Sequence, residues 1–452
     1  MSQRSNFTNK IGFVLAAAGS AVGLGNIWRF PYLAAQYGGG TFLFVYLILV
    51  VTFGFTLMIA EIAIGRKTGL SAIEAYTKLD KRFGFLGVLT AIVPSIILPY
   101  YSVIGGWVTK YLFTFATGGV TAAASDDYFT SFIGTVGEPI GWFFLYIGLT
   151  AIIVLLGVEK GIETVSKFLM PILVVLTVVI ACYGLTVDGA IEGLIYYIKP
   201  NFANFSAKTV LAAMGQMFYS MSLAMGIMIT YGSYMKKENK LESSVRQIEI
   251  FDTGIAFMAG LMVVPGVFAF SGGTTENLQA GPSLMFITLP KVFNSMAFGG
   301  AIGTLFFVLV FFAALTSSIS LMETIVSILC DKFHWNRTFT CIVVTIFCLA
   351  LGIPSALGFS AWSDITFFGS MSILDAYDFI SNSVIMPIVA LLTCILIGFV
   401  VGPKVISDEV KSSDGQFKSE KLFTVIIKWI APIILVIILV SSIATGLGLF
   451  KL

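Results

Sequence analysis

Glycine and polar residues interrupt a long apolar run near the start of the sequence. The run LAAAGSAVGLGNIWRFP holds Gly19, Gly23 and Gly25 near its middle, and Asn26 and Arg29 follow directly. An interrupted helix inside a membrane frees carbonyl and N–H groups, which can then bind ions or charged groups. A packing face of small residues, Gly19-xxx-Gly23, would explain the glycines but not the asparagine and arginine.

A second run of the same kind occurs later in the chain. The segment GQMFYSMSLAMG places Ser220 and Ser222 at a similar depth. These two runs are the first and sixth in the chain, which are corresponding positions of two five-helix halves. Such a pair points to an inverted-repeat transporter with a binding site at the membrane midplane. A third apolar run contains Thr316-Ser317-Ser318, whose hydroxyls could bind an ion or bond back to the preceding helical turn.

The acidic residues Glu61 and Asp252 also fall within apolar runs. An ionisable group at this depth is costly and is therefore a functional candidate. For Asp252 the alternative is a helix cap near the cytoplasmic surface. We expect Glu61 to be structural and to accept a hydrogen bond from the interrupted backbone of the sixth helix.

The composition describes an integral membrane protein, with lipid as its surroundings. Of the 452 residues, 57% are hydrophobic and 11% are charged, whereas soluble domains carry about 25% charged residues. A net charge of +2 gives no reason to expect nucleic-acid binding. The five cysteines lack metal-ligand spacing and there is a single histidine, so we expect no catalytic centre and no enzyme activity.

A membrane-spanning helix needs about 20 mostly apolar residues, and the sequence offers eleven candidates. Their approximate ranges are 11–36, 40–65, 85–117, 141–158, 166–185, 206–235, 247–271, 297–330, 338–354, 372–401 and 423–448. The longest polar segment between them is a loop, residues 402–421. No separate soluble domain remains.

Basic residues predict the orientation, because Lys and Arg concentrate in cytoplasmic loops. With a cytoplasmic N-terminus and eleven spans, the external side keeps only Lys199, Lys208, Lys291 and Lys451. The inner segments then hold Arg4 and Lys10; Arg66, Lys67, Lys78, Lys81 and Arg82; Lys160 and Lys167; Lys236, Lys237, Lys240 and Arg246; Lys332 and Arg337; and Lys404, Lys411, Lys418 and Lys421. We therefore expect a multi-pass protein of the cell membrane, of bacterial inner-membrane type, with an extracellular C-terminus.

The string GSAVGLGNIWRFP (residues 19–31) resembles the first-helix signature of the neurotransmitter:sodium symporter family, which has the leucine-transporter fold. YGGG (37–40), AEIAIGR (60–66), ITYGSY (229–234) and FFAALTSSIS (311–320) resemble further family blocks in the right order. The resemblance covers essentially the whole chain and is strongest to the eleven-helix bacterial members that carry hydrophobic or aromatic amino acids.

This resemblance implies one all-α transmembrane domain, residues 1–452, built as a 5+5 inverted repeat with unwound helices 1 and 6. The first repeat is residues 1–185 and the second is residues 200–402, with helix 11 at 422–452.

The resemblance also implies two sodium sites. The first would use the carbonyl of Ala21, the substrate carboxylate, and the side chains of Asn26, Ser220 and Asp252. The second would use the carbonyls of Gly19, Val22 and Ala313 with the hydroxyls of Thr316 and Ser317. Asp252 departs from the family pattern, which has asparagine there. A fixed carboxylate could replace the chloride ion of chloride-dependent relatives.

By the same resemblance, an amino acid would bind between the two interrupted helices. Its carboxylate would meet the helix N-terminus near Leu24 and Gly25, the Tyr101 hydroxyl and sodium, and its ammonium group would meet carbonyls near Tyr219 and Ser222. Monoamine transporters have aspartate in place of Gly23, so this substrate should bring its own carboxylate. The full set of expected substrate contacts is Ala21, Gly23, Leu24, Gly25, Ile97, Tyr101, Tyr219, Ser220, Ser222, Ala224, Met225, Ser318 and Leu321.

The implied gates are two ion pairs, Arg29 with Asp378 on the outer side and Arg4 with Asp331 on the inner side. A surface ion pair contributes about 0–1 kcal/mol, which suits a gate that must open. The aromatic residues expected beside these gates are Tyr219, Phe7 and Tyr234.

The fifth span carries Gly161 and Pro171, a glycine-x9-proline pattern that resembles one linked in relatives to local unwinding. A lone proline kink is the alternative.

These inferences together predict sodium-coupled, chloride-independent symport of apolar or aromatic L-amino acids into the cell, with two sodium ions. A proton-coupled amino acid permease of the same fold, or a channel or non-transporting sensor, are the alternatives. The hydroxyls of Thr316 and Ser317 argue against the permease, and gates on both sides argue against the channel.

Overall fold

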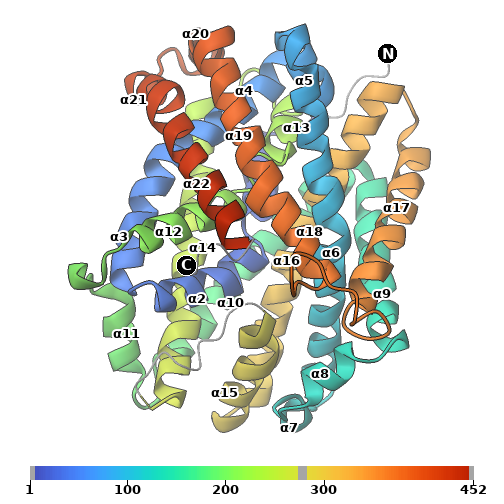
Figure 1. Ribbon diagram of the computed structural model, residues 1–452, viewed down its shortest axis with the longest axis vertical. Coiled ribbons are helices and arrows are strands. Elements are labelled where there is room, and N and C mark those ends of the chain that lie inside the picture. The colour runs from blue at the N-terminus through green and yellow to red at the C-terminus, as the bar shows by residue number, and fades with distance from the viewer. Residues whose placement is uncertain (1–5, 273–281, 447–452) are drawn as a thin grey trace.

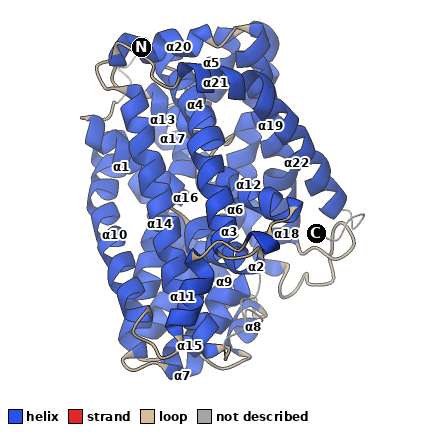
Figure 2. Cartoon of the chain, turned by 90° about the vertical axis from the view of Figure 1, so that its left-hand side faces the viewer, coloured by secondary structure: helices blue, strands red, loops and turns tan. Residues whose placement is uncertain are grey.

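The computed structural model describes residues 6–272 and 282–446. Helices account for all the regular structure of these two ranges, and no strand occurs in them (Figure 2). Long helices run side by side along the length of the molecule, and short helices cover both of its ends (Figure 1). The predicted all-α class is confirmed.

The described residues form eleven spans, as expected. Nine are continuous and apolar enough to cross a membrane, and a tenth is bent by 54° between its two halves. Span 6 is divided by Met221–Gly226 into one helix of 14 residues and one of 7 residues. In chain order the α-helices of the spans are α1 (Lys10–Ala21) with α2 (Phe30–Gln36), α3 (Gly40–Leu49) with α4 (Phe55–Thr68), α6 (Gly84–Ala116), α9 (Gly137–Leu155), α10 (Thr164–Gly184), α12 (Ala207–Ser220) with α13 (Ile227–Ser233), α14 (Leu241–Phe270), α16 (Gly299–Phe333), α17 (Arg337–Leu357), α18 (Ile373–Asp378) with α19 (Met386–Ile395), and α21 (Glu420–Val425) with α22 (Ala431–Gly446).

Several spans contain or begin with a π-helical turn, which widens the helix locally. These turns are η1 (Gly25–Arg29), η2 (Val50–Gly54), η4 (Val158–Glu163), η7 (Phe379–Ile385), η8 (Leu396–Val400) and η9 (Ile426–Ile430). Because of η4, the fifth span begins at Val158, eight residues before the position expected from hydropathy.

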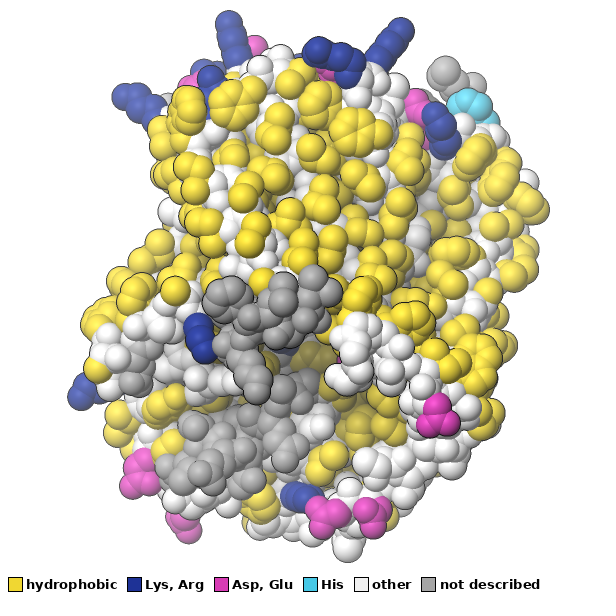
Figure 3. Space-filling model, in the orientation of Figure 1, with side chains coloured by type: hydrophobic (Ala, Val, Ile, Leu, Met, Phe, Trp, Pro, Cys, Tyr) yellow, Lys and Arg dark blue, Asp and Glu magenta, His cyan; other side chains and the backbone are white. Residues whose placement is uncertain are grey.

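The remaining helices are short and lie at the two ends of the bundle (Figure 1). One end carries α5 (Ala72–Leu79) and α20 (Lys404–Asp414). Lys and Arg side chains stand out at this end in Figure 3, and we call it the basic end. The helices on the opposite half are α7 (Val120–Ala123), α8 (Tyr128–Ile133), α11 (Ala190–Ile198) and α15 (Leu289–Ser295) with its π turn η6 (Leu284–Thr288); the short 3-10 turns are η3 (Lys81–Phe83) and η5 (Phe202–Asn204).

The two interrupted spans are packed inside the bundle. Helix α1 contacts α10, α14 and α16, while α13 lies against α4 and α12 against α3. The ends of the helices at both breaks are buried, so their free backbone groups must find partners within the protein. The fold thereby brings the polar residues of the two breaks to one place.

Candidate functional site

The backbone of span 1 leaves the helix at Val22. The Val22 N–H still donates to the Ala18 carbonyl at 2.7 Å. The Gly23 N–H, which would bond to Gly19 in a continuous helix, donates to Asn26 Oδ1 at 3.0 Å instead. The Asn26 N–H similarly turns to the Gly23 carbonyl at 3.1 Å rather than to Val22. The carbonyls of Gly19 and Val22 thus lose their usual donors, which leaves two oxygens available for a cation.

The carbonyl of Ser20 joins three spans. Its usual donor, the Leu24 N–H, points to the Tyr101 hydroxyl at 3.3 Å. The Ser20 carbonyl instead accepts hydrogen bonds from the hydroxyls of Ser222 at 3.0 Å and Ser317 at 3.1 Å. Spans 1, 6 and 8 are therefore tied together at one atom, and Ser20 is a residue that the sequence reasoning missed.

The break in span 6 is held in an unusual backbone conformation. Ser222 and Ala224 have positive φ angles of 53° and 60°, and Gly226 has a φ of 75°. Such strain in non-glycine residues costs about 1–3 kcal/mol each and marks functional segments. The Ala224 N–H donates to Glu61 Oε1 at 2.7 Å, as expected for Glu61. Ala224 contributes this backbone contact and does not line the pocket, contrary to expectation.

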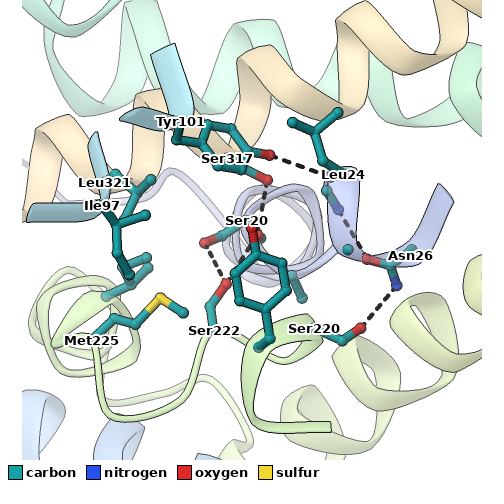
Figure 4. A pocket seen from close by; sticks show the side chains of 15 residues that line it. Ser20, Leu24, Asn26, Ile97, Tyr101, Ser220, Ser222, Met225, Ser317 and Leu321 are labelled. Carbon is teal, nitrogen blue, oxygen red and sulfur yellow. Dashed lines mark hydrogen bonds between the residues drawn. The ribbon is translucent and has the colours of Figure 1, made fainter. Parts of the chain in front are cut away.

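A pocket lies between the two breaks (Figure 4), and most of the expected contact residues line it. Ser318 does not, because its hydroxyl bonds to Tyr146 of span 4 at 2.7 Å. Besides the expected residues, Ser20, Asn26, Ile227 and Ser317 take part in the lining. The space left between the walls is about 30 Å³, which is room for two or three water molecules at about 10–15 Å³ each. The full lining is Ser20, Ala21, Gly23, Leu24, Gly25, Asn26, Ile97, Tyr101, Tyr219, Ser220, Ser222, Met225, Ile227, Ser317 and Leu321.

The side chains expected at the first sodium site lie together. The Asn26 amide donates to Ser220 Oγ at 3.0 Å and to Asp252 Oδ1 at 2.7 Å, and Ser220 also donates to Asp252 at 2.8 Å. Asp252 is fully buried in the middle of α14, which excludes the helix-cap alternative. Among the described residues no Lys or Arg pairs with Asp252, and its Oδ2 has no partner. A buried carboxylate held by neutral donors alone is a favourable partner for a cation.

The residues expected at the second sodium site also meet. A Cβ atom built on Gly19 would lie 3.3 Å from the Cβ of Thr316, so spans 1 and 8 are in contact there. The Thr316 hydroxyl bonds back to the carbonyls of Phe312 at 3.0 Å and Ala313 at 3.1 Å. A hydroxyl that donates its hydrogen keeps its oxygen lone pairs, so the Thr316 oxygen can bind an ion while it holds this bond. The residues predicted for this site therefore lie together and the Thr316 hydroxyl bonds back to the preceding turn, while ion binding here stays a prediction.

Comparison with known proteins identifies the chain. The model of the sodium:neurotransmitter symporter family matches residues 4–131 and 127–448. The chain belongs to this family. It is a transporter of the sodium-dependent class and not an enzyme.

Individual relatives agree with this assignment. An uncharacterized sodium-dependent transporter of Bacillus subtilis is 32% identical over 97% of both chains. The sodium- and chloride-dependent GABA transporter 2 of Rattus norvegicus is 28% identical over 73% of this chain and 62% of its own. The crystal structure of MhsT in complex with L-phenylalanine superposes with a TM-score of 0.88 at 37% identity, covering 97% of this chain and 100% of MhsT. The predicted family and leucine-transporter fold are confirmed.

The two residues expected at the outer gate line one cavity without forming a direct ion pair. This cavity, the vestibule, has a volume of about 470 Å³ and shares Tyr219 with the pocket. The Arg29 guanidinium lies 5.1 Å from the centre of the Tyr219 ring. The Asp378 carboxylate accepts from the Tyr100 hydroxyl at 2.9 Å and from the Asn382 amide. The expected Arg29–Asp378 ion pair is therefore absent from the described part of the chain, because each partner is engaged elsewhere.

Toward the basic end, the described N-terminal residues pack against spans 1 and 6. Arg4 lies outside the described residues, so its expected latch with Asp331 is not seen; Asp331 accepts from the Ser71 N–H at 2.8 Å and the Ser71 hydroxyl at 2.6 Å. The Phe7 ring is fully buried and contacts Phe13, Tyr231 and Tyr234. We call these four aromatic side chains the plug.

The sequence reasoning missed the charged pair behind the plug. The Tyr234 hydroxyl donates to Glu323 Oε1 at 2.7 Å, and Arg337 forms an ion pair with the same carboxylate. Glu323 is fully buried. It lies in an apolar run as Glu61 and Asp252 do, so the depth criterion that found those acids could have found it as well.

Gly161 and Pro171 lie in wound helix. Gly161 belongs to the π turn η4, and a Cβ there would lie 2.1 Å from the Ile153 carbonyl, so close contact with span 4 requires glycine. Pro171 is inside α10. The residue before it, Met170, places its sulfur 3.3 Å from a Cβ built on Gly19. The fifth span thus reaches the residues predicted for the second ion site, and unwinding there stays a prediction.

Proposed function

We propose that this transporter couples the entry of sodium to the uptake of apolar and aromatic L-amino acids, without a need for chloride. The observation that carries the proposal is the fully buried Asp252 carboxylate, beside the pocket and held by neutral donors. A monovalent cation next to this carboxylate would neutralise a charge that burial otherwise makes costly. A resident carboxylate leaves no role for a chloride ion at the same place.

We propose two sodium ions, in the two sets of groups predicted from the sequence. The first set is the Ala21 carbonyl with Asn26, Ser220 and Asp252. The second set is the carbonyls of Gly19, Val22 and Ala313 with Thr316 and Ser317. The freed carbonyls of Gly19 and Val22 support the second set, and oxygen donors of this kind suit hard cations. In this proposal the Thr316 oxygen binds sodium through a lone pair while its hydrogen stays bonded to the preceding turn.

The pocket chemistry favours a zwitterion with an uncharged side chain. The Leu24 N–H and the Tyr101 hydroxyl meet at one end and can bind a carboxylate. Ile97, Met225 and Leu321 offer apolar contact, and the pocket lining contains no charged side chain. A charged substrate side chain would be left without a partner. The complex of MhsT with L-phenylalanine supports the same class of substrate.

We place the protein in the cell membrane with its basic end in the cytoplasm. Lys78, Lys81 and Arg82 near α5 and Lys404 and Lys411 of α20 lie at this end, and in Figure 3 acidic side chains are more prominent toward the opposite end. This asymmetry follows the preference of basic residues for the cytoplasmic side. The vestibule then opens the way for substrate from outside, and the plug closes the inner side.

Uptake of labelled phenylalanine into proteoliposomes tests the proposal. We expect uptake with an inward sodium gradient, none when choline replaces sodium, and no change when gluconate replaces chloride. Uptake in choline driven by a proton gradient would instead indicate a proton-coupled permease. Flux of substrate only down its own concentration gradient, without accumulation inside the proteoliposomes, would indicate a channel.

The variant Asp252→Asn tests the anion role. We expect it to weaken sodium activation or to create a requirement for chloride, since an external anion then becomes useful. The matched control is Glu249→Gln, which neutralises another buried acid one turn earlier on α14, where Arg246 is its partner at 3.0 Å. If Asp252→Asn behaves like the unaltered protein at every chloride concentration, the proposed role of Asp252 is wrong.

The variant Met225→Phe tests the pocket. Each buried methylene contributes about 0.8 kcal/mol, so larger side chains should bind better until they clash, and a flexible methionine postpones the clash. A rigid ring at this position should weaken tryptophan and tyrosine more than valine and alanine in competition against labelled phenylalanine. Equal losses over the size series, or tight binding of glutamate or lysine, would contradict the pocket assignment.

A further inference from the structure

Two neighbouring tyrosines of span 3 line the two cavities that share Tyr219. Tyr101 lines the pocket and accepts the Leu24 N–H, whereas Tyr100 lines the vestibule and donates to Asp378. Successive residues of an α-helix differ by about 100° in direction, so two adjacent residues can reach the pocket and the vestibule. The Tyr100 side chain is 2% exposed, and its position is therefore fixed by packing.

Tyr100, Asp378 and Asn382 form a closed triangle of hydrogen bonds. The Tyr100 hydroxyl donates to Asp378 Oδ1 at 2.9 Å, and the Asn382 amide donates to the same oxygen and to the Tyr100 oxygen at 3.1 Å. Both donors use Oδ1, so Oδ2 remains available for a further partner. Asn382 reaches this place from the π turn η7, which directly follows Asp378 at the end of α18. π turns of this kind often occur at functional sites.

Arg29 is a cationic side chain that lines the vestibule together with Asp378. Its guanidinium lies over the Tyr219 ring, which also covers Gly25, because a Cβ on Gly25 would lie 2.6 Å from that ring. Pairing of Arg29 with Asp378 would close the vestibule above Tyr219. A carboxylate already held in one orientation loses less freedom when it pairs than a free one does.

We propose that Tyr100 is a positioning residue of the outer gate: its hydroxyl fixes the Asp378 carboxylate so that Arg29 can pair with it and close the vestibule. The inference rests on the proposed function, in which substrate enters through the vestibule. Tyr100 does not contact the substrate in this view and acts through Asp378 alone.

The variant Tyr100→Phe tests the proposal, with closure measured in two ways. The first is labelling by a thiol reagent of a vestibule cysteine, Ile104→Cys, in protein with the exposed Cys182 replaced by serine. The second is the KM for phenylalanine in proteoliposomes. Loss of one hydrogen bond of ordinary strength should increase labelling in the presence of sodium and substrate, and raise the KM, each about fivefold. Tyr32→Phe is the matched control, because Tyr32 lines the same cavity, and it should change neither.

A double variant separates positioning from packing. In an Asp378→Asn background, Tyr100→Phe should add no further change if it acts through the carboxylate. A further variant, Asn382→Ala, should shift labelling in the same direction as Tyr100→Phe. It replaces the double variant as the test if the double variant does not fold. Reduced labelling in Tyr100→Phe would mean that the triangle holds Asp378 away from Arg29. An undiminished effect of Tyr100→Phe in the Asp378→Asn background would mean that Tyr100 acts by packing. Either result overturns the proposal. Labelling with sodium alone needs no substrate, so it still reports on the gate if the substrate class proves wrong.

Discussion

Several layers of buried contacts separate the pocket from the basic end, whereas a single layer separates it from the vestibule. Toward the basic end, Phe7 is buried in the plug and its N–H bonds to the Tyr234 carbonyl at 3.1 Å. Glu323 and Arg337 pair behind it. Toward the vestibule, the Tyr219 ring and the Arg29 guanidinium above it form the layer.

Further contacts reinforce the basic end. Arg66 of α4, fully buried, pairs with Glu409 of α20 at 2.8 Å and donates to the Asn239 carbonyl at 2.8 Å. Lys237 reaches the same carboxylate at 2.6 Å. The loop that follows α13 is thereby fastened to α4 and α20. Opening the protein at this end requires the loss of several buried contacts at once, whereas the vestibule side needs one aromatic ring and one arginine to move.

The largest effect is expected for Arg337→Met. It leaves the Glu323 carboxylate buried without its cationic partner, and breaking a buried ion pair in this way costs about 3–5 kcal/mol. The thermal unfolding temperature of the purified protein in detergent should fall clearly. Arg82→Met is the control, because Arg82 and Asp80 form an exposed pair and such pairs contribute little. An unchanged unfolding temperature for Arg337→Met would mean that the basic end does not depend on this pair.

Phe7→Ala should have the next largest effect. It should change the closure of the basic end more than the stability of the fold. The Phe7 ring is fully buried among the other side chains of the plug, and truncation of a buried phenylalanine costs about 3–5 kcal/mol. If the plug forms only when the basic end is closed, this loss favours the open state. Cysteine labelling at Ser233, beside the plug, should rise, whereas Phe333→Ala, an exposed ring at the same end, should leave it unchanged. Equal labelling in both variants would contradict the plug.

Glu163→Gln should loosen the same end by a smaller amount. The Glu163 carboxylate is buried, accepts the Thr8 N–H at 2.8 Å and pairs with Lys167 at 2.6 Å. A hydrogen bond to a charged group contributes about 1.5–3 kcal/mol. The glutamine amide of the variant can still accept a hydrogen bond, so only part of this free energy is lost. Proteolysis or hydrogen exchange of the segment that begins at Asn6 should become faster. No change in exchange would mean that Phe7 alone holds the segment.

Arg29→Ala should have the smallest effect on stability. Its contact with the Tyr219 ring contributes about 0.5–1 kcal/mol, and no ion pair is lost. The unfolding temperature should stay nearly constant, while substrate release becomes faster because the vestibule cannot close. A fall in stability as large as that of Arg337→Met would remove the contrast between the two sides.

The eleven spans and the two breaks could be predicted from the sequence, because each rests on local chemistry. A run of about 20 apolar residues must cross the bilayer. Glycines in such a run, followed by Asn26 and Arg29, interrupt the helix wherever it lies. Glu61 and Asp252 were visible for the same reason, since charge at that depth is rare, whereas Glu323 was missed. The start of the fifth span was placed too late because a π turn has no hydropathy signal.

Only the tertiary structure decided which way each polar group of the site points. Ser317 and Ser318 are adjacent and chemically identical, yet one bonds to the Ser20 carbonyl and the other to Tyr146. Their directions differ by about 100° around α16, so the neighbours supplied by spans 1 and 4 determine their roles. Likewise, Arg29 and Asp378 have opposite charges, but Tyr219 and Tyr100 engage them separately. Spacing along the chain fixes which residues reach the membrane centre, and packing between distant spans selects the partner of each one.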